Sequence, residues 1–160
     1  MQSSNKILST NDLDNVVATW KATQKKIVFT NGCFDILHLG HIDYLEKARA
    51  LGDILMIGVN TDKSVSRIKG PARPINDEYF RLRMLSALGF VDAVTLFDES
   101  TPLQLIKRVL PDILVKGKDY EVSNIVGAET VINAGGKVET IELVDGYSTT
   151  NMIEKIRTIK

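Results

Sequence analysis

Cysteine is almost absent from this chain, which has only Cys33. A single thiol cannot form an internal disulfide, and it leaves no cysteine spacing of the kind that binds zinc. The chain also has no run of about 18 apolar residues, so we expect no membrane-spanning helix. Its first residues, MQSSNKILSTNDLD, lack the apolar centre of a signal peptide. These absences predict a cytoplasmic protein.

A net charge of either sign is also missing, because 20 basic residues balance 20 acidic ones. No overall field therefore favours nucleic acid or an anionic membrane, and we expect neither as a partner. The length of 160 residues and the 44% share of hydrophobic residues are typical of one globular domain. We expect a single domain over 1–160, with a helical lead-in at 1–24 and an α/β core at 25–160.

Short apolar runs alternate with amphipathic segments along the core. The runs are rich in β-branched residues and predict strands at 25–32, 53–62, 91–97, 112–119 and 137–143. The amphipathic segments predict helices at 41–51, 77–89, 101–110, 124–136 and 149–159, and the lead-in predicts another at 9–24. This alternation indicates an α/β fold, a Rossmann-like parallel sheet of five strands with helices on both faces.

Polar residues follow each predicted strand, at the point where the strand ends. The five segments are NGCFDILHLGH, NTD, DES, GKDY and DGYSTT. In a parallel sheet of this kind, ligands bind beyond the carboxyl ends of the strands. We therefore expect the functional site at this edge of the sheet.

The first of these segments contains both histidines of the chain, His38 and His41. Their spacing lets both rings point to one side of the turn that precedes a helix. Gly40 lies at the start of that helix, where free N–H groups favour an anion, and Gly32 permits a close backbone approach or an unusual turn. The dinucleotide glycine pattern and the GxxxxGK[ST] phosphate loop are both absent. The segment indicates a socket for a phosphate that develops charge.

Other interpretations of these residues remain open. Each histidine can be a simple packing or capping residue. A zinc site needs a third ligand, and neither HExxH nor a cysteine partner is present. Cys33 could be a nucleophile, but no histidine lies at a predictable position to activate it, so a small buried spacer is favoured.

Two motifs resemble those of the cytidylyltransferase-like nucleotidyltransferases. GCFDILHLGH is similar to the GxFDxxHxGH signature of that superfamily, and DGYSTTNMI at 145–153 resembles its distal IST[ST] motif. The segments NTDKSVSRIKGPARPINDEYFRLRML and LPDILVKGKDY resemble the bacterial branch that adenylylates D-glycero-β-D-manno-heptose 1-phosphate. The resemblance covers about residues 8–159 and includes no sugar kinase, so it implies a stand-alone transferase.

The resemblance implies that ATP and a sugar 1-phosphate are the substrates, that Mg²⁺ accompanies the triphosphate, and that the protein is a homodimer. It implies that His38 and His41 hold the triphosphate and stabilise the pentacoordinate α-phosphorus. It places Lys69 over the phosphates and Arg81 near the leaving pyrophosphate. The nucleotide-binding residues that it implies are Asn31, Gly32, Cys33, Phe34, Gly40, Gly117, Asp119, Ser148, Thr149 and Thr150.

Three further residues, Asp35, Asp62 and Arg73, are weaker candidates for the acceptor site, and either carboxylate could help to hold the metal. Asp35 could equally brace its loop by accepting backbone N–H bonds. The segment SRIKGPARPIND, 66–77, is expected to be a mobile loop that covers the phosphates. Simpler interpretations leave the basic residues of this loop in solvent, Arg81 on a helix surface and the hydroxyls of 148–149 as ordinary N-caps.

The distal motif also predicts the base. In cytidylyltransferases it usually reads RTEGIST, whereas this chain has Leu143 and Val144 in place of the arginine and threonine. Loss of a planar side chain with five donors favours adenine over cytosine, unless Leu143 simply ends a buried strand. Two alternatives remain: a cytidylyltransferase for a small polyol or amino-alcohol phosphate such as glycerol 3-phosphate, and a nucleotide-binding regulatory module without catalysis.

Overall fold

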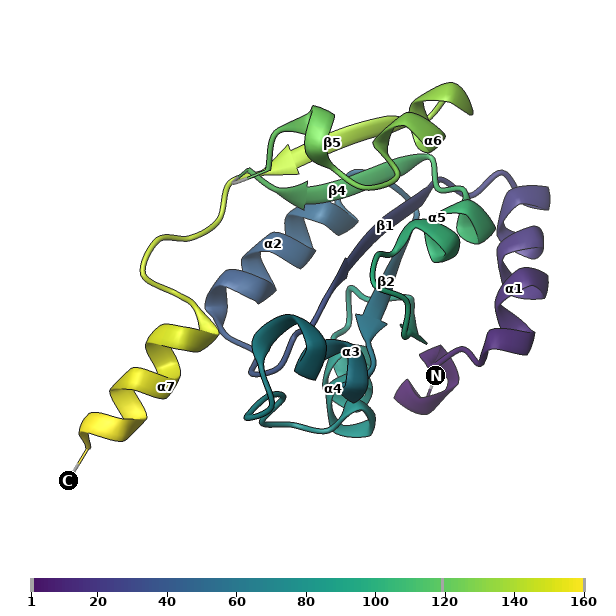
Figure 1. Cartoon of the computed structure of the whole chain (residues 1–160). Helices are drawn as coiled ribbons and strands as arrows, with labels where there is room; N and C mark the ends of the chain where they lie inside the picture. Colours follow the sequence, from purple (N-terminus) through teal and green to yellow (C-terminus); the bar gives the residue numbers. More distant parts are fainter. Residues whose placement is uncertain (1, 119, 160) are drawn as a thin grey trace.

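The computed structural model describes residues 2–118 and 120–159. Within them, five parallel strands form one sheet in the order β3-β2-β1-β4-β5 (Figure 1). The strands are β1 Ile27–Gly32, β2 Ile54–Asn60, β3 Ala93–Phe97, β4 Ile113–Gly117 and β5 Lys137–Ile141. The predicted Rossmann-like parallel sheet is confirmed.

Helices cover both faces of the sheet, as the alternating pattern predicts. The α-helices are α1 Thr10–Ala22, α2 Leu39–Arg49, α3 Asp62–Lys69, α4 Glu78–Ala87, α5 Leu103–Val109, α6 Ala128–Asn133 and α7 Thr149–Thr158, with short 3₁₀ turns at Ser3–Lys6 and Val122–Asn124. One core cluster joins the sheet to α1, α5 and α6, and a second joins it to α2 and α4. On β1, Ile27 and Phe29 belong to the first cluster and Val28 to the second.

Aspartates fix the amino ends of the strands. Asp53, Asp92 and Asp112 each come directly before a strand, and each accepts a hydrogen bond from a backbone N–H at the start of a neighbouring strand. The shortest of these bonds joins the amide of Ile27 to Asp112 Oδ2 at 2.7 Å. Because the first amide of a strand lacks a ladder partner, the carboxylate satisfies it. These bonds lie at the edge of the sheet opposite the predicted site.

Two elements differ from their predictions. Thr61 caps α3 by accepting a hydrogen bond from the amide of Ser64, so residues 66–69 are helical and the predicted loop begins only at Gly70, whose φ is 96°. The predicted helix 124–136 is limited to α6, because Gly127 has a left-handed φ of 87° that a continuous helix cannot contain.

The last helix, α7, extends away from the sheet at the end of a long connection from β5 (Figure 1). It matches the predicted 149–159 closely, and none of its described residues is buried. In the part of the chain that the structure describes, no helix is long and apolar enough to cross a membrane.

The hydrogen bonds of these aspartates can be tested by their effect on stability, independently of the candidate site. Asp112→Ala removes the acceptor of the Ile27 amide, so we expect the free energy of unfolding to fall by about 1–3 kcal/mol. Urea denaturation measures this change. Asp112→Asn keeps a side-chain oxygen and should lose less. Equal stability of the alanine variant and the unchanged protein would contradict this role.

Candidate active site

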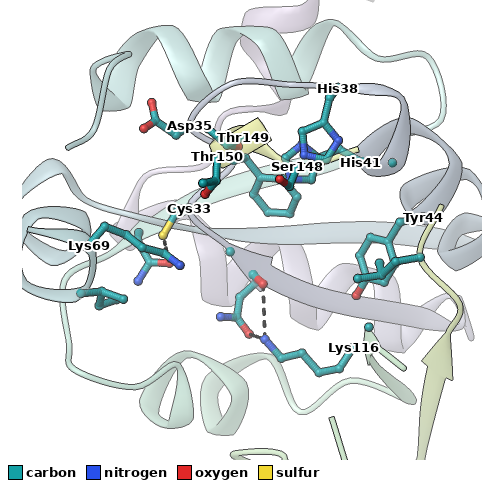
Figure 2. Close-up of a pocket in the computed structure, with 18 of the residues that line it drawn as sticks. Cys33, Asp35, His38, His41, Tyr44, Lys69, Lys116, Ser148, Thr149 and Thr150 are labelled. Carbon is teal, nitrogen blue, oxygen red and sulfur yellow. Dashed lines mark hydrogen bonds between the residues drawn. The ribbon is translucent and has the colours of Figure 1, made fainter. Parts of the chain in front are cut away.

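The candidate site lies where the strand order reverses. β2 and β3 lie on one side of β1, and β4 and β5 lie on the other. The loops that leave the carboxyl ends of β1 and β4 therefore run apart and open a crevice for a ligand. A cavity of about 520 Å³ occupies this place, bordered by the ends of β1, β2 and β4 and the start of α7 (Figure 2). The predicted residues Asn31 to Asp35, His38, Gly40 and His41 all line it.

The two histidines stack against each other on the wall of this cavity (Figure 2). The ring centroids of His38 and His41 are 3.8 Å apart, with 22° between the planes. His38 is the N-cap residue of α2 but makes no side-chain capping bond. Within the described residues, the Nδ1 atoms of both rings are buried and have no hydrogen-bond partner. A packing or capping role does not explain two unpaired polar atoms, because leaving them unpaired costs free energy.

Burial disfavours the protonated form of both rings in the free protein. It lowers the pKa of His38, and burial together with the nearby charge of His38 lowers the pKa of His41 to about 4. An anion bound beside the stacked rings would act in the opposite direction and favour the protonated forms. The pair is therefore a socket whose charge follows its ligand.

Glycines make room for the rings that build the socket. A Cβ on Gly32 would lie 3.0 Å from the ring of Phe34, and one on Gly40 would lie 3.1 Å from Nδ1 of His38. The left-handed turn after β1 falls at Phe34, with a φ of 48°, and not at Gly32. Of the two roles proposed for Gly32, close approach is the one observed. The ring of Phe34 packs 5.2 Å from that of His41.

Asp35 braces the loop that follows α3. Its carboxylate accepts hydrogen bonds from the amides of Ile75 and Asn76 at 2.8 and 2.9 Å and pairs with Nε of Arg73 at 2.6 Å. Burial alone would raise the pKa of Asp35, but these bonds outweigh it and hold the pKa below its usual range. The loop expected to be a mobile cover is thus tied to the first motif. Arg73 and Asp35 both line the cavity and are already paired with each other.

Arg81 lies behind the cavity instead of inside it. Its guanidinium is buried and donates to the carbonyl oxygens of Cys33 at 2.7 Å and Asn76 at 3.0 Å, and to Asp62 Oδ1 at 2.8 Å. The simpler interpretation of Arg81 as a residue on a helix surface is therefore wrong. Neither Arg81 nor Asp62 is among the residues that line the large cavity, so the structure does not bring them to the phosphate site.

The start of α7 also lines the cavity, next to the first motif. Ser148 caps the helix by accepting a hydrogen bond from the amide of Asn151, as predicted. The hydroxyl of Thr149 donates to the carbonyl oxygen of Ile36 in the first motif at 3.4 Å. Together with Thr150, these residues line the cavity and bring free helix N–H groups to it. Capping and phosphate binding are compatible here.

The remaining predicted residues have mixed positions. Lys69 is the last residue of α3, and it lines the cavity, as does Gly117 at the end of β4.

Burial raises the pKa of the Cys33 thiol, and the positive charges of Lys69 and Arg81 only partly oppose this rise. A neutral thiol is a poor nucleophile, which supports the interpretation of Cys33 as a spacer. Asp119 lies outside the described residues.

Several cavity residues were missed by the sequence analysis. They include Tyr44, Asn60, Lys116, Tyr120 and Tyr147, whereas Leu143, which the distal motif linked to the base, also lines the cavity. For Lys116 a signal was present, because a lysine near the end of the apolar strand ILVKG has no reason to be there without a polar partner. Tyr120 and Tyr147 lie in loops whose direction no periodicity predicts, whereas Tyr44 lies on α2.

The carboxylates that the structure describes do not form a metal centre. Among residues 2–118 and 120–159, no group of three or more histidine, cysteine, aspartate or glutamate side chains could hold a metal ion. The two carboxylates considered for this role are engaged by arginines, Asp35 by Arg73 and Asp62 by Arg81. A cation at this site would depend mainly on the oxygen atoms of a bound phosphate and water.

The fold and the site together define a class, the α/β nucleotidyltransferases. Their crevice lies at the switch point of the sheet and is lined by the histidine pair and by the first residues of α2 and α7. Within that class, the model of the cytidylyltransferase-like family matches residues 29–155. The chain belongs to the cytidylyltransferase-like family, and the resemblance seen in its two motifs is confirmed.

Curated relatives match nearly the whole chain. It is 53% identical over 154 residues to the bifunctional protein HldE of Citrifermentans bemidjiense, which is 96% of this chain and 32% of that protein. It is 54% identical over 144 residues to HldE of Campylobacter jejuni, which is 90% of this chain and 30% of that protein. The chain spans about a third of the length of the curated relatives it matches.

Solved structures share the fold. The lipopolysaccharide core biosynthesis protein of Thermoplasma volcanium is 35% identical with a TM-score of 0.60, and the match covers 78% of this chain and 99% of that one. Pantoate-beta-alanine ligase of Francisella tularensis has a TM-score of 0.64 over 96% of this chain and 79% of that one. At 15% identity, the second likeness shows the fold alone.

The protonation of the socket can be measured directly. In the free protein we expect the ring of His41 to titrate with a midpoint of about 4 in an NMR experiment, and pyrophosphate should raise that midpoint. Because the unfolded chain protonates this ring below about pH 6.5, the free energy of unfolding should fall as pH drops from about 6.5 toward 4. His38→Ala removes a nearby charge and should raise the midpoint of His41. A midpoint at or above 6.5 in the free protein would contradict this account.

Proposed function

We propose that this chain transfers the AMP group of ATP to the phosphate of D-glycero-β-D-manno-heptose 1-phosphate. An oxygen of the sugar phosphate attacks the α-phosphorus, the bond from that phosphorus to the bridging oxygen breaks, and pyrophosphate leaves. The products are ADP-heptose and pyrophosphate. The observation that carries the proposal is the stacked histidine pair, with unpaired buried Nδ1 atoms among the described residues, at the switch point of the sheet.

The chain's own residues have little covalent work in such a reaction. They position two anions and neutralise the charge that develops on the α-phosphate. His38 and His41 donate hydrogen bonds to the phosphate oxygens, and the N–H groups at the starts of α2 and α7 add further donors. Lys69, at the end of α3, supplies a cation from the other wall. Arg81 acts by holding the loop of the histidines, because protein oxygens already accept its hydrogen bonds.

Mg²⁺ is proposed as the ion that accompanies ATP. Phosphate oxygens and water would hold it, because Asp35 and Asp62 already pair with arginines. When bound, the ion supplies charge neutralisation on the triphosphate.

Several observations support adenine as the base. Leu143 lies beyond the end of β5 and is 50% exposed on the cavity wall, so it does not simply end a buried strand. Tyr120 and Tyr147 line the same cavity and offer flat surfaces for a purine ring. The cytidylyltransferase alternative would need a substitute for the missing arginine of the distal motif.

The heptose acceptor rests on sequence likeness. The segments between the two motifs resemble the heptose branch, and the chain is similar to HldE proteins and to a lipopolysaccharide core biosynthesis protein. A regulatory module without catalysis would not need two histidines whose Nδ1 atoms are buried and, among the described residues, unpaired, with Lys69 on another wall of the same cavity. A triphosphate substrate also agrees with a cytoplasmic location.

A homodimer remains part of the proposal. α7 leaves the sheet with an apolar stripe that includes Met152, Ile153 and Ile156, and Ile156 is 60% exposed. Such a stripe is typical of a surface that packs against another element. A second copy of the chain is the partner that the family resemblance implies.

The histidines are the first test of catalysis. His38→Ala and His41→Ala should each lower turnover of ATP and heptose 1-phosphate by about 100- to 1000-fold, because their bonds are strongest in the transition state. Initial rates of pyrophosphate release measure this loss. The matched control is Asp112→Ala, which weakens the opposite edge of the sheet and should retain turnover below its melting temperature. Turnover within threefold of the unchanged protein in either histidine variant would rule out the assignment.

The base is tested by competition between nucleotides. With heptose 1-phosphate as acceptor, kcat/KM should favour ATP over CTP by at least about tenfold, because one buried polar mismatch costs about 1–3 kcal/mol. Leu143→Arg restores the arginine of the cytidylyltransferase motif and should reduce that ratio. Equal use of both nucleotides, or a preference for CTP, would instead favour the polyol-phosphate cytidylyltransferase.

A further inference from the structure

The cavity extends to both sides of β1, and different elements line its two halves. On the side of β4 and β5 it is lined by Tyr120 and Leu143, which follow those strands and are proposed to meet the base. Figure 2 shows Lys69, at the end of α3, across the pocket from Lys116 of β4. A nucleotide whose base lies over β4 leaves the other half for the second substrate. This half, which we call the β2–β3 pocket, is lined by Asn60, Ile68, Lys69, Phe97, Ser100 and Pro102.

The carboxyl ends of β2 and β3 form the floor of the β2–β3 pocket. Asn60 is the last residue of β2, and its partner in the register of the sheet is Phe97, the last residue of β3. The amide of Thr61 donates to the carbonyl oxygen of Phe97 at 3.0 Å, which keeps the two strand ends together. The side chains of Asn60 and Phe97 are each only 5% exposed. The floor therefore combines a buried carboxamide with an apolar ring.

The carboxamide of Asn60 is held in place but is not fully hydrogen-bonded. Its Nδ2 donates to Ser64 Oγ at 2.9 Å, and Ser64 is buried in the first turn of α3. Its Oδ1 accepts from the thiol of Cys33 at 3.8 Å, and a thiol is a weak donor. Among the described residues, the second N–H of Nδ2 has no acceptor. A hydroxyl group both donates and accepts, so it is the ligand group that matches this remaining capacity.

The other residues of the β2–β3 pocket also suit a sugar phosphate. Ser100 adds an exposed hydroxyl in the connection from β3 to α5. Phe97 and Pro102 offer apolar surface against which the C–H groups of a sugar can pack, while a few polar groups fix its orientation. Lys69 adds a cation for the phosphate.

We propose that the β2–β3 pocket binds the sugar of the acceptor, and that Asn60, positioned by Ser64, forms hydrogen bonds with one of its hydroxyl groups. This inference rests on the proposed function. The phosphate of the acceptor lies between Lys69 and the histidine pair, where one of its oxygens can attack the α-phosphorus. A site built to bond a hydroxyl discriminates against an analogue that lacks it, because the buried polar group is then left unpaired. Asn60 is thus a specificity-determining residue for a polyhydroxylated acceptor.

Steady-state kinetics separate the two substrates. Asn60→Leu removes the carboxamide at nearly constant volume, so we expect KM for heptose 1-phosphate to rise about tenfold while KM for ATP stays within about twofold. Ser64→Ala releases the amide from its orientation and should raise the acceptor KM by about threefold. The matched control is Thr95→Val. It removes a buried hydroxyl from neighbouring β3 that donates to the carbonyl oxygen of Leu8 and does not line the cavity.

A binding measurement separates this inference from the proposed activity. Calorimetry would titrate heptose 1-phosphate, and in parallel glycerol 3-phosphate, into the protein saturated with a non-hydrolysable ATP analogue. Acceptor binding that is weakened in Asn60→Leu but kept in Thr95→Val supports the inference. Ser100→Ala changes an exposed residue, should weaken acceptor binding by about threefold, and decides the question if Asn60→Leu does not fold.

The two acceptors distinguish failure of the proposed function from failure of the inference. Binding of glycerol 3-phosphate alone, with a dependence on Asn60, would show that the heptose acceptor is wrong and would still support the β2–β3 pocket. The inference is overturned if Asn60→Leu and Ser100→Ala bind the acceptor as tightly as Thr95→Val does. It is also overturned if they lose affinity for the ATP analogue instead, or if the unchanged protein binds neither phosphate.

Discussion

The buried guanidinium of Arg81 is the interaction on which the site depends. It joins three segments that are distant in the sequence: the carbonyl of Cys33 after β1, the carboxylate of Asp62 at the start of α3, and the carbonyl of Asn76 before α4. Asp35 ties the same loop to Arg73. A buried charge is expensive unless it is fully paired, so these partners can be arranged in few other ways. The loop of the histidines is therefore held from behind by Arg81, which does not line the cavity, and from the side by the pair of Asp35 and Arg73, which does.

This support explains how the first motif can hold an unfavourable conformation. Phe34 occupies the left-handed region, which costs a residue other than glycine about 1 kcal/mol or more. The turn directs its ring over Gly32 and against His41, and the ring in turn limits where the imidazole can lie. The carbonyl of the preceding residue, Cys33, is the one that Arg81 holds. The strained turn and the buried guanidinium thus form one unit, and the socket is a consequence of both.

The sheet, its order of strands along the chain and the location of the site could be predicted, because buried parallel strands and their polar ends leave a repeating pattern. Side-chain partners could not. Nothing local in RLRML distinguishes an arginine that is buried from one that faces solvent, since two of its three partners, Cys33 and Asp62, come from other segments. The sequence analysis did not predict α3, because its first residue, Asp62, is equally compatible with the end of a strand. Lys116 gave a local signal, but its meaning depends on Asn31, 85 positions away.

Protonation of the histidine pair costs free energy in the free protein, and a bound anion can supply that free energy. Moving the pKa of His41 from about 4 back to its ordinary value requires about 3 kcal/mol of favourable interaction in the bound state. One unit charge at about 4 Å supplies about 4 kcal/mol at the effective dielectric typical of a protein surface, so a single phosphate oxygen is sufficient. Two imidazoles at 3.8 Å that were both charged without a ligand would instead repel each other by a similar amount. The stacked pair is therefore stable only as a neutral unit when empty, and it gains charge where and when an anion enters. Affinity for the polyphosphate and stabilisation of its transition state then come from the same proton equilibrium.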